Sequence, residues 1–208
     1  KVFFKFIITI GELWIFTNKI WVKALHKPRW QIVGKENIKS NGWTIATSNH
    51  QSFADIFLLQ DITNMKMPML KFFMKYVLIY VPVIGLSWWA LDMPFLKRYT
   101  KKQLEKNPKL AGKDIREMKR ALKHYSLYPV TVFSFAEGTR FTSKKHQNQN
   151  SPFENLLKPK EGGLATALSL VNKIDALIDF TIQFDSKKRS FWDYLCGRMN
   201  TAKIIIKE

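Results

Sequence analysis

The chain has 208 residues with one cysteine, Cys196, and 34 lysine and arginine residues against 16 aspartate and glutamate residues. One cysteine excludes an internal disulfide framework and a cysteine-rich metal site, and it fits a reducing compartment. The formal net charge of +18 indicates an anionic partner, which leaves nucleic acid, an anionic membrane and phosphorylated substrates open.

The first 25 residues carry many apolar side chains, including Trp14 and Trp21. A spanning helix needs ~20 largely uncharged residues, and Lys5, Glu12 and Lys19 interrupt every such window. The pattern is typical of an interfacial helix or of the end of a membrane segment. An amphipathic helix packed on a domain explains it equally well. We expect a membrane-associated segment over residues 1–28 and a catalytic domain over 29–208, in a piece of a longer chain.

Strands and helices alternate along the rest of the chain. Apolar runs rich in β-branched residues predict buried strands at 30–33, 43–48, 130–135, 178–184 and 202–206. The stretches between them predict helices at 53–62, 69–79, 112–125 and 163–172. Residues 142–159, rich in polar side chains and proline, predict a long loop or excursion. The alternation predicts an α/β domain with a central sheet.

Polar residues follow two of the predicted strands. The strand at 43–48 runs into Asn49 and His50, and the strand at 130–135 runs into the sequence Glu-Gly-Thr-Arg at 137–140. In open α/β sheets, ligands bind in the crevice at the carboxyl ends of the strands. We therefore expect both clusters to share one crevice.

His50 and Asp55 are candidates for a general base and its carboxylate partner. Residues five apart do not share a face of a continuous helix. Ser52 and Asp55, however, match the serine-x-x-acid pattern of a helix start, so a turn would let the two side chains meet. The carboxylate would then fix the tautomer of the histidine. The alternative is that Asp55 only caps the helix and His50 is only a turn residue.

No nucleophile or metal ligand set accompanies this pair. Ser48 and Ser52 flank the histidine in sequence, and neither is an obvious nucleophile. A base without a protein nucleophile indicates that the substrate supplies one, most simply a hydroxyl. The other histidines stand alone in the sequence, so we expect no metal.

The second cluster has the composition of an anion site. Gly138 lets backbone amides approach an anion, and Arg140 presents a planar fork that matches phosphate oxygens. Glu137 is out of place there, and it either holds Arg140 or Thr139 or shapes the turn.

The motifs resemble those of the PlsC-type glycerolipid acyltransferases, the lysophosphatidic acid acyltransferase superfamily. The NHxxxxD motif stands at residues 49–55 and the FxEGTR motif at 135–140. Between them, Lys75, the PxxG sequence at 82–85 and Arg98 match the second motif. A closer likeness, to the lysocardiolipin acyltransferase-like branch and its bacterial relatives, rests on residues 88–99, on 137–142 followed by 145–147, and on a threonine, Thr181, where proline is usual.

The resemblance implies a central mixed sheet flanked by helices, with an N-terminal membrane-associated helix. It implies transfer of an acyl group from acyl-CoA or acyl carrier protein to the hydroxyl of a lysophospholipid, most simply 1-acyl-glycerol-3-phosphate, without a cofactor. His50 would be the base and Asp55 would hold it. The residues implied for the acceptor's phosphate are Lys75, Arg98, Glu137, Gly138, Thr139 and Arg140.

The implied location is an anionic membrane, on the cytoplasmic side of a bacterial inner membrane, with no nucleic acid as partner. Three alternatives stay open: another acceptor such as lysocardiolipin, a basic nucleic-acid-binding module, and an inert membrane-bound scaffold. The sequence has no helix-turn-helix, RRM or zinc-finger signature. The presence of His50, Asp55 and Arg140 argues against a scaffold.

Overall fold

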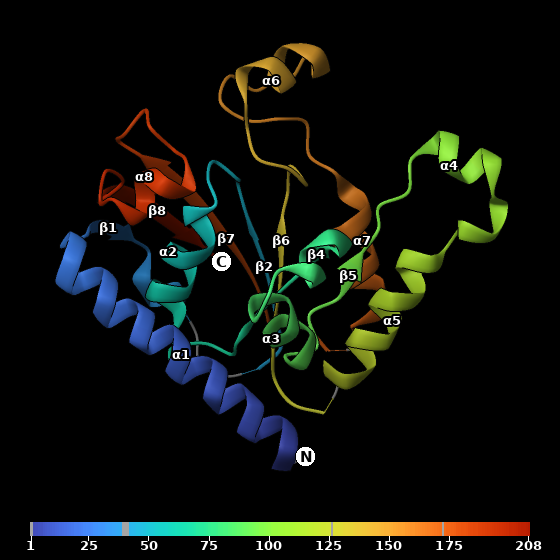
Figure 1. Ribbon diagram of the computed structural model, residues 1–208, viewed down its shortest axis with the longest axis horizontal. Helices are drawn as coiled ribbons and strands as arrows, with labels where there is room; N and C mark the ends of the chain where they lie inside the picture. The colour runs from blue at the N-terminus through green and yellow to red at the C-terminus, as the bar shows by residue number, and fades with distance from the viewer. Residues whose placement is uncertain (1, 39–41, 126, 172) are drawn as a thin grey trace.

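A mixed sheet forms the centre of the computed structural model, which describes residues 2–38, 42–125, 127–171 and 173–208. Six strands of these described ranges lie in the order β1-β8-β7-β2-β6-β3 (Figure 1). They are β1 (Arg29–Val33), β2 (Thr44–Ser48), β3 (Leu70–Phe72), β6 (Thr131–Phe135), β7 (Ala176–Phe184) and β8 (Thr201–Lys207). β7 and β8 pair antiparallel, and the other described neighbours pair parallel. The predicted α/β class with a mixed sheet is confirmed.

Helices cover both faces of this sheet. α1 (Val2–His26) and α2 (Ala54–Thr63) lie to one side, and α5 (Lys113–Tyr125) and α7 (Glu161–Leu170) lie to the other (Figure 1). The shorter helices are α3 (Ile84–Ala90), α4 (Lys101–Lys106), α6 (Ser143–Gln149), α8 (Phe191–Leu195) and the 3₁₀ turns η1 (Lys35–Asn37), η2 (Tyr76–Tyr80) and η3 (Pro108–Leu110). A separate ladder pairs β4 (Met74–Lys75) with β5 (Phe95–Leu96).

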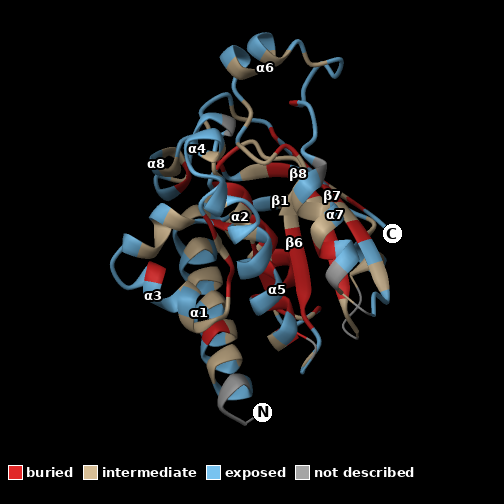
Figure 2. Cartoon of the chain, turned by 90° about the vertical axis from the view of Figure 1, so that its right-hand side faces the viewer, coloured by how far each residue is buried: buried red, intermediate tan, exposed pale blue. Residues whose placement is uncertain are grey.

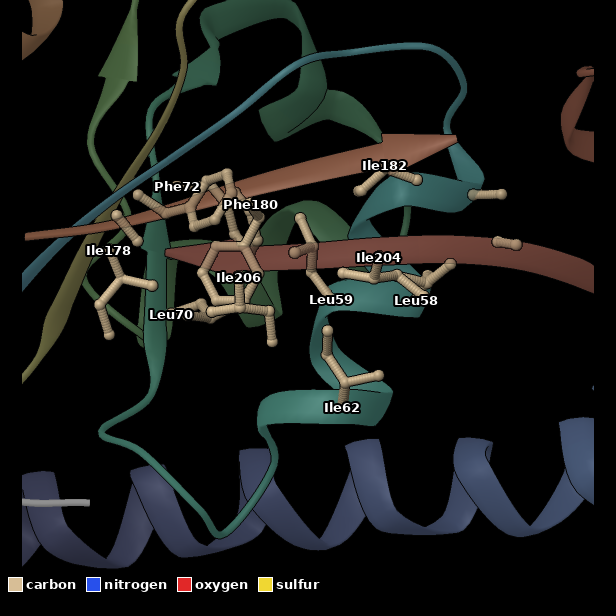
Figure 3. Close-up of a cluster of buried hydrophobic side chains, with 14 of the residues drawn as sticks. Leu58, Leu59, Ile62, Leu70, Phe72, Ile178, Phe180, Ile182, Ile204 and Ile206 are labelled. Atoms are coloured by element: carbon tan, nitrogen blue, oxygen red, sulfur yellow. The ribbon is translucent and has the colours of Figure 1, made fainter. Parts of the chain in front are cut away.

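The core follows from the alternation of side chains along each strand. In β2, Ile45 packs with α5 and α7, whereas Ala46 packs on the side of α2. Figure 3 shows the larger cluster, in which side chains of α2 meet those of β3, β7 and β8. Its members include Leu58, Leu59, Ile62, Phe72, Phe180 and Ile204. Burial of each such side chain contributes about 1.5–3 kcal/mol, so this cluster holds α2 against the sheet.

The predicted helix at 69–79 is wrong. This stretch forms β3, β4 and then η2. β3 pairs with β6 at the edge of the sheet, with Phe72 opposite Phe133. A short apolar run suits a buried strand as well as a helix, and here pairing with a distant strand decided the outcome.

The other helix predictions agree with the structure within a few residues. α7 begins at Glu161 and ends at Leu170, while residue 172 of the predicted helix lies outside the described residues. The excursion at 142–159 contains α6, which Figure 1 and Figure 2 both show standing apart from the sheet. The excursion returns through Leu157, which is buried.

α1 packs on the domain but keeps many apolar side chains exposed, and Figure 2 shows much of its surface as exposed or intermediate. Between α1, the end of α2 and α3 lies an apolar cavity of about 370 Å³. None of the helices in the described ranges is both long enough and apolar enough to cross a bilayer.

Candidate active site

β2 delivers His50 to the end of the sheet through an asparagine that continues the strand pairing. The Asn49 side chain donates to the Ile182 carbonyl and accepts from the Ile182 amide, each at 2.8 Å. The Ser48 carbonyl accepts from the Ala136 amide at 3.0 Å. His50 therefore lies where β2 leaves β6 and β7, at the carboxyl ends of these parallel strands.

The turn after β2 brings His50 and Asp55 together. His50 Nδ1 lies 2.8 Å from Asp55 Oδ2, which also accepts from the amides of Gln51 (2.7 Å) and Ser52 (2.9 Å). The Asp55 side chain is fully buried, and the His50 side chain is mostly buried. A carboxylate only accepts, so this contact requires a proton on Nδ1, and in a neutral imidazole that leaves Nε2 as the acceptor.

Half of the predicted capping pattern forms. The Asp55 side chain accepts from the Ser52 amide, as in a capping box. The Ser52 hydroxyl, however, accepts from the Ala54 amide at 3.2 Å and donates to the Arg189 carbonyl at 2.7 Å. α2 then begins at Ala54. The turn therefore serves the histidine pair more than the helix start.

The second cluster holds His50 from the other side. The His50 ring stacks on the Phe135 ring, with centroids 3.9 Å apart and planes 13° apart. The His50 carbonyl accepts from the Phe141 amide at 2.7 Å. The sheet thus joins the two sequence clusters at one site, as expected from the ends of their strands.

Glu137 ties backbone segments together. Its side chain is buried, and its oxygens accept from the amides of His50 and Leu157, each at 2.8 Å. Of the interpretations drawn from sequence, these contacts support the one in which Glu137 shapes the turn. A buried carboxylate committed to two amides repels a phosphate, so Glu137 is a positioning residue here.

Arg98 reaches the cluster from the β5 side. The backbone amides of Lys97 and Arg98 donate to Asp114, at 2.9 and 2.7 Å, and Arg98 has a φ of 54°. The Arg98 guanidinium donates to the Gly138 carbonyl at 2.7 Å. Burial lowers the pKa of Arg98, and the charge of Asp114 opposes that shift.

Sequence reasoning missed Lys145, which the excursion places at the same point. Its Nζ donates to Thr139 Oγ1 at 2.8 Å and to the Arg140 carbonyl at 2.9 Å. Burial lowers the pKa of Lys145, and so do the charges of Arg140, Lys75 and Lys160, whereas Glu137 opposes them. The likeness of residues 145–147 to the bacterial relatives singled out Lys145 in the sequence, but it assigned no role to this side chain.

These cations form what we call the basic cluster: Lys75, Arg98, Arg140, Lys145 and Lys160. The last of them lies against Gly138, where an added Cβ would come within 2.9 Å of Lys160 Cδ, and Gly138 has a φ of 63°. The Arg140 guanidinium lies 3.8 Å from the centre of the exposed Phe53 ring. The cluster therefore surrounds the Gly-Thr turn with positive charge suited to phosphate oxygens.

A buried carboxylate that fixes a histidine tautomer, next to a basic cluster at the strand ends of a mixed sheet, is the arrangement expected of a glycerolipid acyltransferase. The family model described as Acyltransferase matches residues 29–183, well over half of the chain. The chain belongs to this family, in the PlsC-type glycerolipid acyltransferase superfamily.

Known relatives agree with this membership. The 1-acyl-sn-glycerol-3-phosphate acyltransferase delta of Bos taurus is 32% identical over 144 residues, which cover 64% of this chain and 34% of that protein. The 1-acyl-sn-glycerol-3-phosphate acyltransferase 3 of Arabidopsis thaliana is 28% identical over 167 residues, 73% of this chain and 39% of that protein. The chain thus spans about a third of the length of the curated relatives it matches.

The crystal structure of the 1-acyl-sn-glycerophosphate acyltransferase PlsC from Thermotoga maritima has the same fold. Its TM-score with this structure is 0.56 at 18% sequence identity, over 100% of this chain and 82% of that chain. The likeness covers α1 as well as the sheet.

Proposed function

We propose that the protein is a lysophospholipid O-acyltransferase that moves a fatty acyl group from acyl-CoA or acyl carrier protein to 1-acyl-glycerol-3-phosphate, giving phosphatidic acid. The observation that carries this proposal is the contact of 2.8 Å between His50 and buried Asp55 beside the basic cluster. The named activity of the relatives supports the choice of acceptor.

His50 is the general base of the proposed reaction. Its Nε2 takes the proton of the acceptor's hydroxyl as the hydroxyl oxygen attacks the thioester carbonyl. The tetrahedral intermediate collapses with cleavage of the carbon–sulfur bond, and the imidazolium returns the proton to the departing thiolate. Asp55 holds the Nδ1 proton and stabilises the imidazolium, and no covalent intermediate with the protein forms.

The basic cluster binds the phosphate of the acceptor. Arg98 and Lys145 contact the Gly138–Thr139 turn, and the charges of Arg140, Lys75 and Lys160 act on Lys145. Burial and then these like charges lower the pKa of Lys145, and the negative charge of a phosphate would offset the repulsion between the cations. Phosphate binding at the basic cluster would place the acceptor's hydroxyl relative to His50. The segment 135–141 contacts the backbone of His50 and also contributes to the basic cluster.

α1 is the proposed contact with an anionic bilayer, on the cytoplasmic face of a bacterial inner membrane. The apolar side chains that it exposes are Phe6, Ile10, Leu13, Trp14, Phe16, Ile20, Trp21 and Leu25. Tryptophans and lysines on one helix suit the interface between headgroups and acyl chains. In this proposal residues 1–28 hold the enzyme at its lipid substrates and residues 29–208 carry the chemistry.

The test is acyl transfer by the purified protein in anionic vesicles, with acyl-CoA and acyl carrier protein as donors and a panel of lysophospholipids as acceptors, read by lipid mass spectrometry. We expect phosphatidic acid as the main product. If lysocardiolipin were the preferred acceptor, the proposed acceptor would be wrong, but the proposed acyl transfer would stand. Binding of DNA by the protein together with no acyl transfer to any acceptor would overturn the proposal.

A further inference from the structure

A second cavity, of about 510 Å³, lies between α5 and the segment that joins η2, α3 and β5. We call it the α5 cavity. Its lining runs from Lys113 in the first turn of α5 to His124 near its end, about 16 Å of helix at 1.5 Å per residue. Its volume falls within the range of small-molecule sites, about 300–1,000 Å³.

Cations line one wall of the α5 cavity. Lys113, Arg116 and Arg120 follow helical spacing on α5, and Lys97 faces them from the end of β5. All are exposed to solvent, and the contact of Arg116 with the Ala111 carbonyl is long, at 3.5 Å. The carboxylates in the same lining are Asp92, Asp114 and Glu117. Since Asp114 accepts from two backbone amides, the cations are available for the phosphate groups of a ligand.

Aromatic rings and the partly exposed carboxylate of Asp92 complete the lining. The rings are those of Tyr76, Trp89, Phe95 and Tyr99. At the inner end the Asp92 side chain is 22% exposed, and its Oδ1 lies 3.3 Å from His124 Nδ1. Aromatic side chains stack on nucleic acid bases, and a carboxylate oxygen accepts from the exocyclic amine of a base. The cavity thus combines the chemistry of a base subsite with that of a phosphate subsite.

The α5 cavity adjoins the candidate active site through two consecutive residues. Lys97 lines the cavity, whereas the guanidinium of Arg98 reaches Gly138 in the basic cluster. Asp114 holds the backbone amides of both residues, at 2.9 and 2.7 Å. Lys97 and Arg98 therefore link the α5 cavity to the proposed site of the acceptor.

We propose that the α5 cavity binds the adenosine 3′,5′-bisphosphate part of coenzyme A, and that the acyl donor is a CoA thioester. The assignment rests on the proposed function, because it names the donor of that reaction. The base stacks among the aromatic rings with its amine at Asp92. The phosphates contact Arg116, Arg120 and Lys113. A carrier protein presents its phosphopantetheine without a nucleotide, so the base subsite has no use with that donor.

The test compares Arg116→Ala and Arg120→Ala with Lys119→Ala, which removes one positive charge from α5 outside the cavity lining. Titration calorimetry with CoA, adenosine 3′,5′-bisphosphate and 4′-phosphopantetheine measures affinity. Removal of a charged phosphate contact weakens binding about tenfold. We expect that loss for CoA and for the bisphosphate in both arginine variants, unchanged phosphopantetheine affinity, and the parent's values for Lys119→Ala.

The outcomes separate the cavity from the reaction. Equal CoA affinity in the parent and both arginine variants overturns the assignment, even where acyl-CoA is a good donor. Selective loss of carrier-protein binding, with CoA binding unchanged, overturns it as well. CoA binding that depends on Arg116 and Arg120, in a protein that transfers no acyl group, supports the cavity and contradicts the proposed function instead.

Discussion

His50 Nδ1 lies 2.8 Å from Asp55 Oδ2, an oxygen that also accepts from the amides of Gln51 and Ser52. These amides anchor the carboxylate, so that its oxygen sets both the orientation and the tautomer of the ring. Stacking on the Phe135 ring restricts the tilt of the imidazole plane.

Replacement of the base removes acyl transfer. We expect His50→Ala to lower kcat by about 10²–10⁴-fold, the usual weight of a positioned general base, while the thermal unfolding curve stays close to that of the parent. His26→Ala is the matched control, since His26 lies at the end of α1. Acyl transfer by His50→Ala at the parent's rate would contradict the assignment of His50 as the base.

A change at Glu137 tests positioning against phosphate binding. In Glu137→Gln an NH₂ group replaces one of the two oxygens that accept from the backbone amides of His50 and Leu157. One of these amides then has no acceptor, which lowers the free energy of unfolding by about 1–3 kcal/mol. We expect a lower kcat with a nearly unchanged KM for the acceptor, because the turn that carries His50 shifts. Exposed Glu154→Gln is the control. A rise in KM alone contradicts the positioning role.

Lys145 and Lys144 form a matched pair for the phosphate site. Lys145 contacts Thr139 and Arg140, whereas Lys144 is exposed on α6. We expect Lys145→Ala to raise KM for 1-acyl-glycerol-3-phosphate about tenfold, because a charge-assisted contact is lost. Lys144→Ala should leave KM within twofold of the parent. Equal KM values in the two variants exclude Lys145 from the acceptor's site.

Buried Lys71 makes stability depend on pH. It donates to the Leu91 carbonyl at 2.6 Å, and burial lowers its pKa to about 8. The unfolded chain therefore binds more protons than the folded protein between about pH 8 and its ordinary pKa of 10.5, so stability rises with pH across this window.

The variant Lys71→Met removes that dependence. At 1.36 kcal/mol per pKa unit the charge costs about 3 kcal/mol below pH 8. We expect the difference in unfolding free energy between Lys71→Met and the parent to be most favourable to the variant below pH 8 and to shrink toward pH 10.5. Denaturant unfolding at several pH values measures it, with Lys119→Met as control. A difference that is constant with pH contradicts the shifted pKa.

Paired tryptophan variants test the membrane contact. Trp21 on α1 and Trp192 on α8 are both exposed. Loss of a large apolar side chain from a bilayer contact weakens binding about tenfold or more. We expect Trp21→Ala to lower co-sedimentation with anionic vesicles by this factor and Trp192→Ala to leave it unchanged. Equal loss in both variants contradicts the proposed role of α1.

The sequence by itself determined the strands that carry the site and the meeting of His50 with Asp55. Runs such as 43–48 and 130–135 form strands because their apolar, β-branched side chains fit a sheet buried on both faces. The turn at Ser52 is local, so a motif within seven residues, 49–55, predicts it.

Only the tertiary structure decided the rest. Residues 69–79 form strands and a 3₁₀ turn because β3 pairs with β6, a contact that local periodicity does not contain. Glu137 serves the backbone of His50 and Leu157, and Lys145 reaches Thr139 from an excursion that looked like a loop. The α5 cavity brings residues of α5 together with Lys97 at the end of β5, and Asp114 joins these two segments. Each of these depends on contacts between distant segments, whose geometry is set by packing of the whole chain.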